Sequence, residues 1–281
     1  MNYDAWLRLA FLGLHPERTR TLLDRFGTAS SVVDAIERGD VKVNTKLLEA
    51  GECRRRVERC GVTFGLAADA AWAASFSHVP DPPEWLFERG SLVAEPRVAI
   101  VGTRRCTEYG RRLAFECAEA CAAAGWTVVS GLARGIDGAA HRGALASGGK
   151  TVAVLGCGSD IRYPREHTSL HREIIHRGGT VVTEYPPGAA PLAWRFPPRN
   201  RIISGLAAAV VVIESAVTGG SLSTAARAVV QGRTVFALPG DVDRVASVGC
   251  NLLIRDGAIP VLGADDLVVG LSLVTGAPSG R

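Results

Sequence analysis

Two kinds of hydrophobic periodicity divide the chain. Between residues 1 and 60 the apolar positions recur every three or four residues, which predicts helices with one buried face. From residue 97 onward, short and nearly continuous apolar runs alternate with stretches of helical periodicity. These runs predict strands at 97–101, 126–130, 151–155, 179–183, 208–214 and 233–238.

Strands that are apolar at almost every position are typical of a parallel sheet with both faces covered by helices. The pattern therefore predicts an α/β fold: an extended Rossmann-like, doubly wound, mostly parallel sheet. We divide the chain into a helical domain at 1–60, a connector with one short strand at 61–96, the Rossmann-like domain at 97–270 and a flexible tail at 271–281.

The segment "LGLHPERTRTLLDRFG" in the helical domain combines a glycine turn, a proline near a helix start and a glycine at the helix end. It resembles a helix-hairpin-helix or SAM-like module, in which backbone amides of the turn can contact a phosphate. The alternative is a small helical domain that only packs against its neighbours. The sequence leaves both interpretations open.

Composition changes this picture little. The formal charge is +4, hydrophobic residues make up 47% and charged residues 21%, as in a soluble globular protein with a sizeable core. Nearly all basic residues are arginine, which codon bias alone can produce, so only arginines clustered on glycine-rich turns count as evidence. The seven cysteines form no CxxC pair, and no run reaches transmembrane length, so we expect a soluble protein of the reducing cytoplasm.

Glycine-rich loops with arginines follow four of the predicted strands. They read "VGTRRCTEYG", "SGLARGIDGAAH", "GCGSDIRYPREH" and "ESAVTGGSLSTAA". In an open parallel sheet, ligands bind beyond the carboxyl ends of the strands. Backbone amides at helix starts combined with guanidinium groups predict phosphate as the ligand.

Other motifs are weaker. "GCGSDI" lacks the third glycine of a dinucleotide fingerprint, so we expect no such cofactor. His167 and His171 have the spacing of metal ligands without a third partner, which favours solvated histidines over a metal site. Ser221 is expected to cap its helix rather than act as a nucleophile. Four acids near strand ends could be catalytic, but we favour pairing with arginines and helix capping: Asp137, Asp160, Glu184 and Glu214.

Taken in order, the loops resemble the DNA-processing protein A (DprA/Smf) family. The resemblance covers residues 97 to about 260 and rests on "VAIVGTRRCTEYG", "VVSGLARGIDGAAHRGAL", "TVAVLGCGSDIRYPREH", "VTEYPPG", "FPPRNRIISGLAAAVVVIES", "TGGSLSTA", "GRTVFALPGD" and "GCNLLIRDGA". It implies a Rossmann-like core that binds single-stranded DNA, dimerises and is not an enzyme. It further implies a role in natural transformation, in which the protein helps load RecA past the single-strand-binding protein.

The resemblance also implies the DNA-contacting residues. They are Gly102, Thr103, Arg104, Ser130, Gly131, Arg165, Arg195, Phe196, Arg199, Asn200, Arg201, Gly219, Gly220 and Ser221. Three departures from the family pattern stand out. Thr103 replaces the usual serine, His167 replaces the usual asparagine, and we expect no C-terminal winged helix after the core.

Individual roles follow from the chemistry of single-strand binding, which needs charge along the backbone and a flat face for the bases. Phe196 or Trp194 is the predicted base platform. We expect Arg195 to face solvent and DNA, and one of Arg199 and Arg201 to point inward and bond a carboxylate such as Glu184 or Glu214. The family resemblance places the dimer surface near "NLLIRDGAIPVLGADDLVV".

Two rival functions remain. Rossmann-like proteins of the lysine-decarboxylase-like group hydrolyse nucleoside monophosphates with a Gly-Gly-x-Gly-Thr turn and a glutamate one helical turn later. The corresponding "GGSLSTAAR" contains no carboxylate between Thr224 and Arg227, which disfavours hydrolysis. A nucleotide-sensing regulator is the other alternative.

Overall fold

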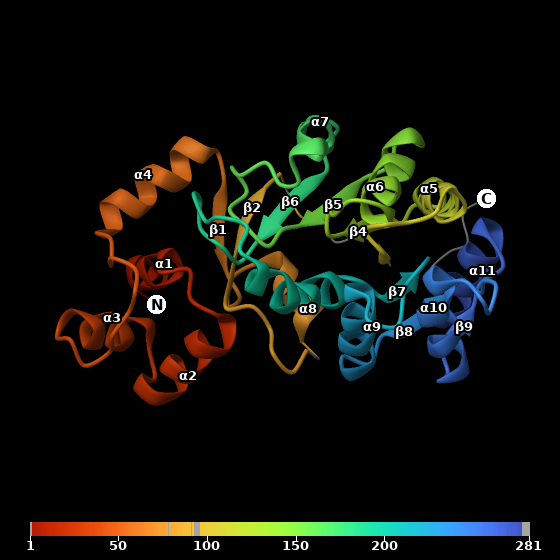
Figure 1. Ribbon diagram of the computed structural model, residues 1–281. Coiled ribbons are helices and arrows are strands. Elements are labelled where there is room, and N and C mark those ends of the chain that lie inside the picture. The colour runs from red at the N-terminus through yellow and green to blue at the C-terminus, as the bar shows by residue number, and fades with distance from the viewer. Residues whose placement is uncertain (1, 78, 91, 93–95, 277–281) are drawn as a thin grey trace.

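The computed structural model describes every residue except 1, 78, 91, 93–95 and 277–281. Its N-terminal part is a cluster of helices, the red and orange elements of Figure 1: α1 (Tyr3–Phe11), α2 (Pro16–Phe26), α3 (Ala29–Glu37) and α4 (Ala50–Cys60). Side chains of Asn2 and Thr28 accept hydrogen bonds from backbone amides in the first turns of α1 and α3, which satisfies donors that a helix start leaves free.

A single nine-stranded sheet forms the core of the molecule, in the order β1-β2-β6-β5-β4-β3-β7-β8-β9. Pairing is parallel from β6 to β9 and antiparallel for β1 and β2. The strands are β1 (Thr63–Leu66), β2 (Trp85–Arg89), β3 (Arg97–Val101), β4 (Thr127–Ser130), β5 (Thr151–Val154), β6 (Thr180–Thr183), β7 (Ala209–Val212), β8 (Thr234–Ala237) and β9 (Ile259–Pro260).

The six strands expected from the apolar runs are confirmed as β3 to β8. The segment 61–96 differs from the expected connector with one strand, because it contributes both β1 and β2 to the sheet. These strands carry aromatic residues that pack against the N-terminal helices, among them Phe64, Trp85 and Phe87. The helical domain is therefore joined to the sheet through a shared core.

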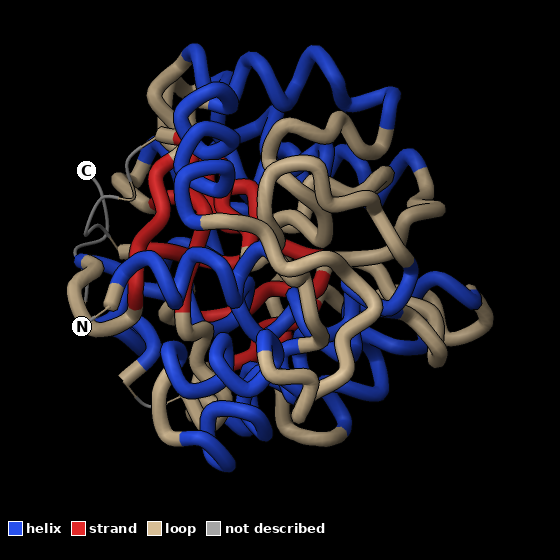
Figure 2. Tube along the Cα trace, turned by 90° about the vertical axis from the view of Figure 1, so that its left-hand side faces the viewer, coloured by secondary structure: helices blue, strands red, loops and turns tan. Residues whose placement is uncertain are grey.

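Helices cover both faces of the sheet (Figures 1 and 2). One face packs against α5 (Glu108–Ala123), α6 (Ile136–Ala146), α7 (Thr168–His176) and α11 (Ala264–Thr275). The other packs against α8 (Phe196–Leu206), α9 (Gly220–Val230), α10 (Val245–Arg255) and the short 3-10 helix η1 (Ala71–Phe76). Alternate residues of β3 enter the two cores, Val98 and Ile100 on one side, Ala99 and Val101 on the other.

The strand order contains a reversal beside β3. The chain builds outward from β3 through β4 and β5 to β6, then returns to lay β7 along the opposite edge of β3. The loops after β3 and β7 leave the sheet in opposite directions, which opens a crevice at the carboxyl ends of these two strands. The strand order therefore predicts a ligand site in the crevice at the carboxyl ends of β3 and β7.

The C-terminal boundary also differs from expectation. The predicted flexible tail began at 271, but α11 continues to Thr275 with Leu271 fully buried. Residues 277–281 of that tail lie outside the described residues. No helix among those described is long and apolar enough to cross a membrane.

Candidate nucleic-acid interface

A groove of about 570 Å³ occupies the crevice at the carboxyl ends of β3 and β7, and we call it the switch-point groove. The loop after β3, the start of α9 and one side of α8 form its walls. Of the expected site residues it brings together Gly102, Thr103, Arg104, Phe196, Arg199, Asn200, Gly219, Gly220 and Ser221.

Close packing of the loops fixes the floor of this groove. A Cβ on Gly102 would lie 2.5 Å from a side-chain carbon of Ile136 and 2.9 Å from the Glu214 carbonyl oxygen, so no side chain fits there. The next residue, Thr103, donates its amide to that same Glu214 carbonyl at 2.8 Å. The loop after β3 is therefore tied to the loop after β7.

Arg104 and Phe196 are in contact in the lining of the groove. Arg104 is exposed, and its guanidinium carbon lies 5.5 Å from the centre of the Phe196 ring. Phe196 is half-buried at the first position of α8, with Tyr163 packed at 5.5 Å from its ring. This places an exposed cation beside a partly exposed aromatic face.

Arg199 lies under the groove instead of projecting from it. It is 3% exposed and donates hydrogen bonds to the carbonyl oxygens of Gly131, at 2.9 Å, and Val154. Burial lowers the pKa of its guanidinium to about 10, and the nearby carboxylate of Asp137 opposes that shift. Asp137, itself buried, accepts the amides of Gly131 and Ala133, and burial raises its pKa.

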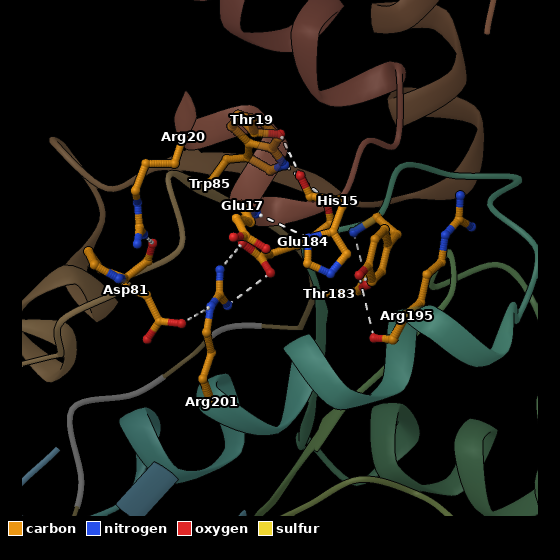
Figure 3. Close-up of polar contacts among 12 residues, drawn as sticks. His15, Glu17, Thr19, Arg20, Asp81, Trp85, Thr183, Glu184, Arg195 and Arg201 are labelled. Atoms are coloured by element: carbon orange, nitrogen blue, oxygen red, sulfur yellow. Dashed lines mark hydrogen bonds and ion pairs between the residues drawn. The ribbon is translucent and has the colours of Figure 1, made fainter. Parts of the chain in front are cut away.

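Arg201 projects from α8 toward Glu184 and Asp81 (Figure 3) and is not among the residues that line the switch-point groove. It donates two hydrogen bonds to the Glu184 carboxylate, at 2.7 and 2.9 Å, and lies 3.3 Å from Asp81. Burial disfavours the charged guanidinium, yet the adjacent Glu184 raises its pKa above the ordinary value. The expected inward arginine paired with Glu184 is thus Arg201, and Arg199 is buried as well.

The expectation that Arg195 faces solvent is wrong. It is 9% exposed, donates to the Ala190 carbonyl at 2.7 Å, and stacks over Tyr185 and Trp194 with its guanidinium carbon 4.8 and 5.0 Å from their rings. In Figure 3 its side chain points away from the Arg201 cluster. The short 3-10 helix η3 (Ala193–Arg195) turns the chain before α8, which directs this arginine toward the N-terminal helices.

The turn between α1 and α2 packs on this same region. Gly13 has a φ of +58°, and a Cβ there would meet the Arg195 guanidinium at 3.2 Å. His15 packs on Trp194, with ring centres 5.7 Å apart. The "LGLHP" turn therefore contacts the sheet domain, as expected of a packing module, and Trp194 is engaged there and not at the groove.

The remaining expected residues occupy different places. Ser130 is fully buried and donates its hydroxyl to the Ile100 carbonyl, whereas Gly131 lines a small pocket next to the groove, together with Arg104 and Phe196. Arg165 is exposed at the start of the short 3-10 helix η2 (Arg165–His167), following Pro164 of that pocket. Asn200 donates its side-chain amide to the Gly220 carbonyl at 3.4 Å.

The four acids near strand ends all have structural partners. Besides Asp137 and Glu184, Glu214 accepts from the amide and hydroxyl of Thr107 at the start of α5, and Asp160 accepts the amide of Gly188. Glu184 thus pairs with an arginine and Glu214 supports a helix start, as expected of these acids, whereas Asp137 and Asp160 accept backbone amides of loops. Ser221, however, does not cap α9, because its hydroxyl donates to that of Ser215 at 2.8 Å.

The expectation of solvated histidines at 167 and 171 is wrong, since both rings are buried. His167 directs Nδ1 toward the Leu132 carbonyl at 3.0 Å, and His171 lies 3.4 Å from Arg162. Among the residues that the structure describes, no group of three or more His, Cys, Asp or Glu side chains is placed to hold a metal ion.

Sequence reasoning missed a second cavity, also of about 570 Å³, which we call the arginine groove. It is lined by Arg104, Arg105, Arg111, Arg134 and Arg142, with Cys106 and Phe115 between them. Arg111 and Arg142 lie inside helices and not on glycine-rich turns, so the loop pattern gave no signal for them.

The sequence of this chain is similar to those of a known protein family. The family model described as DNA recombination-mediator protein A matches residues 63–272. Protein Smf of Escherichia coli is 45% identical over 193 residues, which cover 68% of this chain and 52% of that protein. The chain spans about half the length of several curated relatives.

Two solved structures resemble the whole or most of the molecule. DNA processing protein A from Streptococcus pneumoniae superposes with a TM-score of 0.79 at 31% identity, covering 93% of this chain and 95% of that one. DNA processing protein A from Helicobacter pylori, described for its single-stranded DNA binding mode, gives a TM-score of 0.65 at 27% identity, covering 75% of this chain and 97% of that one.

Proposed function

The chain belongs to the DNA recombination-mediator protein A family, and we propose that it binds single-stranded DNA in the switch-point groove. In this proposal it receives and protects incoming single strands during natural transformation in the cytoplasm. The Helicobacter pylori relative, described for its single-stranded DNA binding mode, supports the proposal.

The observation that carries the proposal is the charge of the switch-point groove. Arg104, Arg105 and Arg199 line it, whereas Asp137 is the one carboxylate among its described lining residues and is buried beneath the loops. The start of α9 adds backbone amides without a side-chain cap. Such a surface attracts a polyanion without reading its bases.

Each side chain has a separate task in this proposal. Arg104 binds a backbone phosphate, and Phe196 offers its ring to a base, an interaction worth about 1–3 kcal/mol per stacked base. Arg199 and Asp137 do not touch the strand. They hold the loops after β4 and β5 in place below it, so that the groove is formed before DNA arrives.

Fluorescence anisotropy with labelled oligo-dT tests this proposal. Arg104→Glu places a negative charge at the phosphate site, so binding should weaken at least roughly a hundredfold. Arg59→Glu makes the same charge change on an exposed arginine of α4 and should bind as the wild type does. Equal affinities of the folded wild type and Arg104→Glu would remove the switch-point groove from the proposal.

The proposed assembly is a homodimer. Exposed apolar residues near the C-terminus support it: Ile259, Leu262, Val269 and Leu273 are 40%, 82%, 53% and 80% exposed. Burial of these residues against a second copy would remove apolar area from water. Light scattering at micromolar concentration should give a dimer mass for the wild type and a monomer mass for Leu262→Glu. A monomeric wild type would contradict the proposed dimer.

RecA and the single-strand-binding protein are the further proposed partners. The family description as a recombination mediator supports RecA, since a mediator transfers single strands to the recombinase. The test is RecA ATPase activity on DNA already coated by single-strand-binding protein. The wild type should shorten the lag before activity, and Arg104→Glu should not. A lag that the wild type leaves unchanged would contradict RecA loading.

We further propose that the protein acts by binding and has no catalytic step. The nucleoside monophosphate hydrolase alternative needs an acid in the first turns of α9, where this chain has Thr224 and Arg227. Base release from AMP should stay at background, and a measurable rate would revive the enzyme. A nucleotide sensor would be stabilised thermally by a mononucleotide and not by oligo-dT, the reverse of what we expect.

A further inference from the structure

The arginine groove adjoins the switch-point groove, and the two share Arg104 and Arg105. Beyond these shared residues it lies against α5 and α6, which contribute Arg111 and Arg142. A ligand that fills the first groove and extends past Arg105 therefore enters the second one without leaving the protein surface.

The charge of the arginine groove is poorly balanced. None of its described lining residues is Asp or Glu. Arg134 pairs with Glu166 at 2.5 Å and Arg111 lies 3.4 Å from Glu108, both at exposed positions. Within the described part of the chain, Arg105 and Arg142 have no ion pair with a carboxylate, and Arg142 donates only to the Gly138 carbonyl.

Acidic partners accompany several arginines on other helix surfaces. On α4, Arg54, Arg55 and Arg56 each pair with a carboxylate, from Asp4 or Glu52. Arg112, one residue after Arg111, pairs with Glu116 at 3.1 Å. Several arginines on other helix surfaces are thus paired with acids, whereas the described lining of the arginine groove contains none.

The walls of this groove are rigid. A Cβ on Gly143 of α6 would lie 2.1 Å from the Phe115 carbonyl oxygen of α5, so the backbones of the two helices are in close contact. The backbone positions of Arg111 in the first turn of α5 and Arg142 in the middle of α6 are therefore fixed relative to each other. Both side chains are exposed, so their guanidinium groups can turn toward an anion that lies between the two helices.

We propose that the arginine groove holds the continuation of the single strand that occupies the switch-point groove, an inference that rests on the proposed function. The sugar-phosphate backbone passes Arg105, and Arg111 and Arg142 donate hydrogen bonds to phosphodiester oxygens. Of the aromatic rings among the described lining residues, Phe115 is half-buried and His167 is buried. The bases of this part of the strand consequently point to solvent, and binding there is independent of sequence.

Oligonucleotide length separates this inference from the proposed function. We compare the wild type with Arg111→Gln/Arg142→Gln on oligo-dT of about 6 and about 15 nucleotides, within the usual range of single-strand site sizes. The double variant should bind the longer strand roughly tenfold more weakly and the shorter strand unchanged. Its salt dependence on the longer strand should fall by about 0.7 in slope for each phosphate that the variant no longer binds.

A matched control makes the same change in overall charge as the groove variant. Arg38→Gln/Arg59→Gln removes two exposed arginines from the helical domain and should bind both lengths as the wild type does. If the groove variant weakens both lengths equally, or neither, the strand does not continue there and the inference fails. If the wild type binds neither length, the proposed function fails first, and this inference with it.

Protection of Cys106 gives a second, independent readout on the unmodified protein. Its half-buried thiol lines the arginine groove, and the half-buried Cys60 in the helical domain serves as an internal reference. The longer oligo-dT should slow alkylation of Cys106 by N-ethylmaleimide, while the shorter one should not, and Cys60 should react unchanged. Equal protection by inorganic phosphate at the same ionic strength would show a simple anion site and overturn the inference.

Discussion

Arg201 and Glu184 form a buried ion pair with two hydrogen bonds, 2.7 and 2.9 Å long, that joins the middle of α8 to the residue after β6. Other residues of α8, Phe196 and Asn200, line the switch-point groove. The pair therefore fixes the helix that forms one wall of the proposed DNA site, without itself reaching the DNA.

Breaking this pair from one side should destabilise the fold strongly. Glu184→Ala leaves Asp81 as the remaining carboxylate beside the buried Arg201 charge, so the free energy of unfolding should fall by about 3 kcal/mol, the low end of the range for a buried charge that loses its partner. Urea unfolding should show that the double variant Arg201→Met/Glu184→Leu loses less free energy of unfolding than the sum of the losses in Arg201→Met and in Glu184→Leu. Strict additivity would mean that the two charges do not depend on each other.

Gly110 should be intolerant of any side chain. A Cβ there would clash with the Glu214 carboxylate, which caps α5 through Thr107 and lies behind the loop after β3. Gly110→Ala should lower the free energy of unfolding by about 1–3 kcal/mol, the range for overpacking. Gly51→Ala in α4 is the control: its new Cβ would meet only the flexible Arg55 side chain at 3.5 Å, so the substitution should be neutral or slightly stabilising. Equal stability of the two variants would contradict the close packing of Glu214 against the start of α5.

Phe196 and Arg104 should affect DNA binding in different ways. Phe196→Ala removes a stacking surface, so it should weaken oligo-dT binding by about 1–3 kcal/mol at every salt concentration and leave the salt dependence unchanged. Arg104→Gln should weaken binding most at low salt. Anisotropy titrations at three ionic strengths distinguish the two variants. A reduced salt dependence of binding in Phe196→Ala would show that the ring acts mainly by positioning Arg104.

Buried histidines predict a loss of stability in mild acid. Burial lowers the pKa of His171 to about 4, with Arg162 nearby adding to the effect, and that of His141 to about 3. Unfolded histidines take up protons near pH 6.5, so between pH 6.5 and about 4 the unfolded state binds more protons. The free energy of unfolding should therefore decrease as the pH is lowered through this window, by up to about 1.4 kcal/mol per pH unit for each histidine.

Urea unfolding at pH 7.5, 6 and 5 measures this slope. His171→Gln should flatten it by the contribution of one histidine, whereas His176→Gln, at a position nearer the surface, should leave it as in the wild type. A slope that His171→Gln does not change would show that this ring takes up its proton in the folded protein as readily as in the unfolded one, which contradicts the lowered pKa.

The parallel sheet was predictable because its strands are apolar at nearly every position, and the loops at strand ends because glycines mark them. The antiparallel strands β1 and β2 escaped full prediction. Their apolar residues face the N-terminal helices, as Phe64 and Phe87 do, and a local pattern does not reveal that distant partner.

The direction in which side chains point was the other feature that could not be predicted from the sequence. Arg195, Arg199 and Arg201 lie close together in the sequence, with Phe196 and Asn200 between them, and the sequence alone gives all three the same charge near the same loop. The turn of η3 into α8 decides which face each meets: the N-terminal helices, the floor of the groove, or Glu184. The arginine groove was missed for a related reason, since α5 and α6 bring its residues together only in three dimensions.

The salt dependence of binding to oligo-dT and to a duplex of equal length tests the central claim most directly. For oligo-dT, the logarithm of the association constant should fall linearly with the logarithm of salt concentration, by about 0.7 for each phosphate bound, and Arg104→Gln should reduce that slope by about 0.7. The duplex should bind more weakly than oligo-dT at every salt concentration. A slope near zero, or tighter binding of the duplex, would contradict a single-strand site at the switch-point groove.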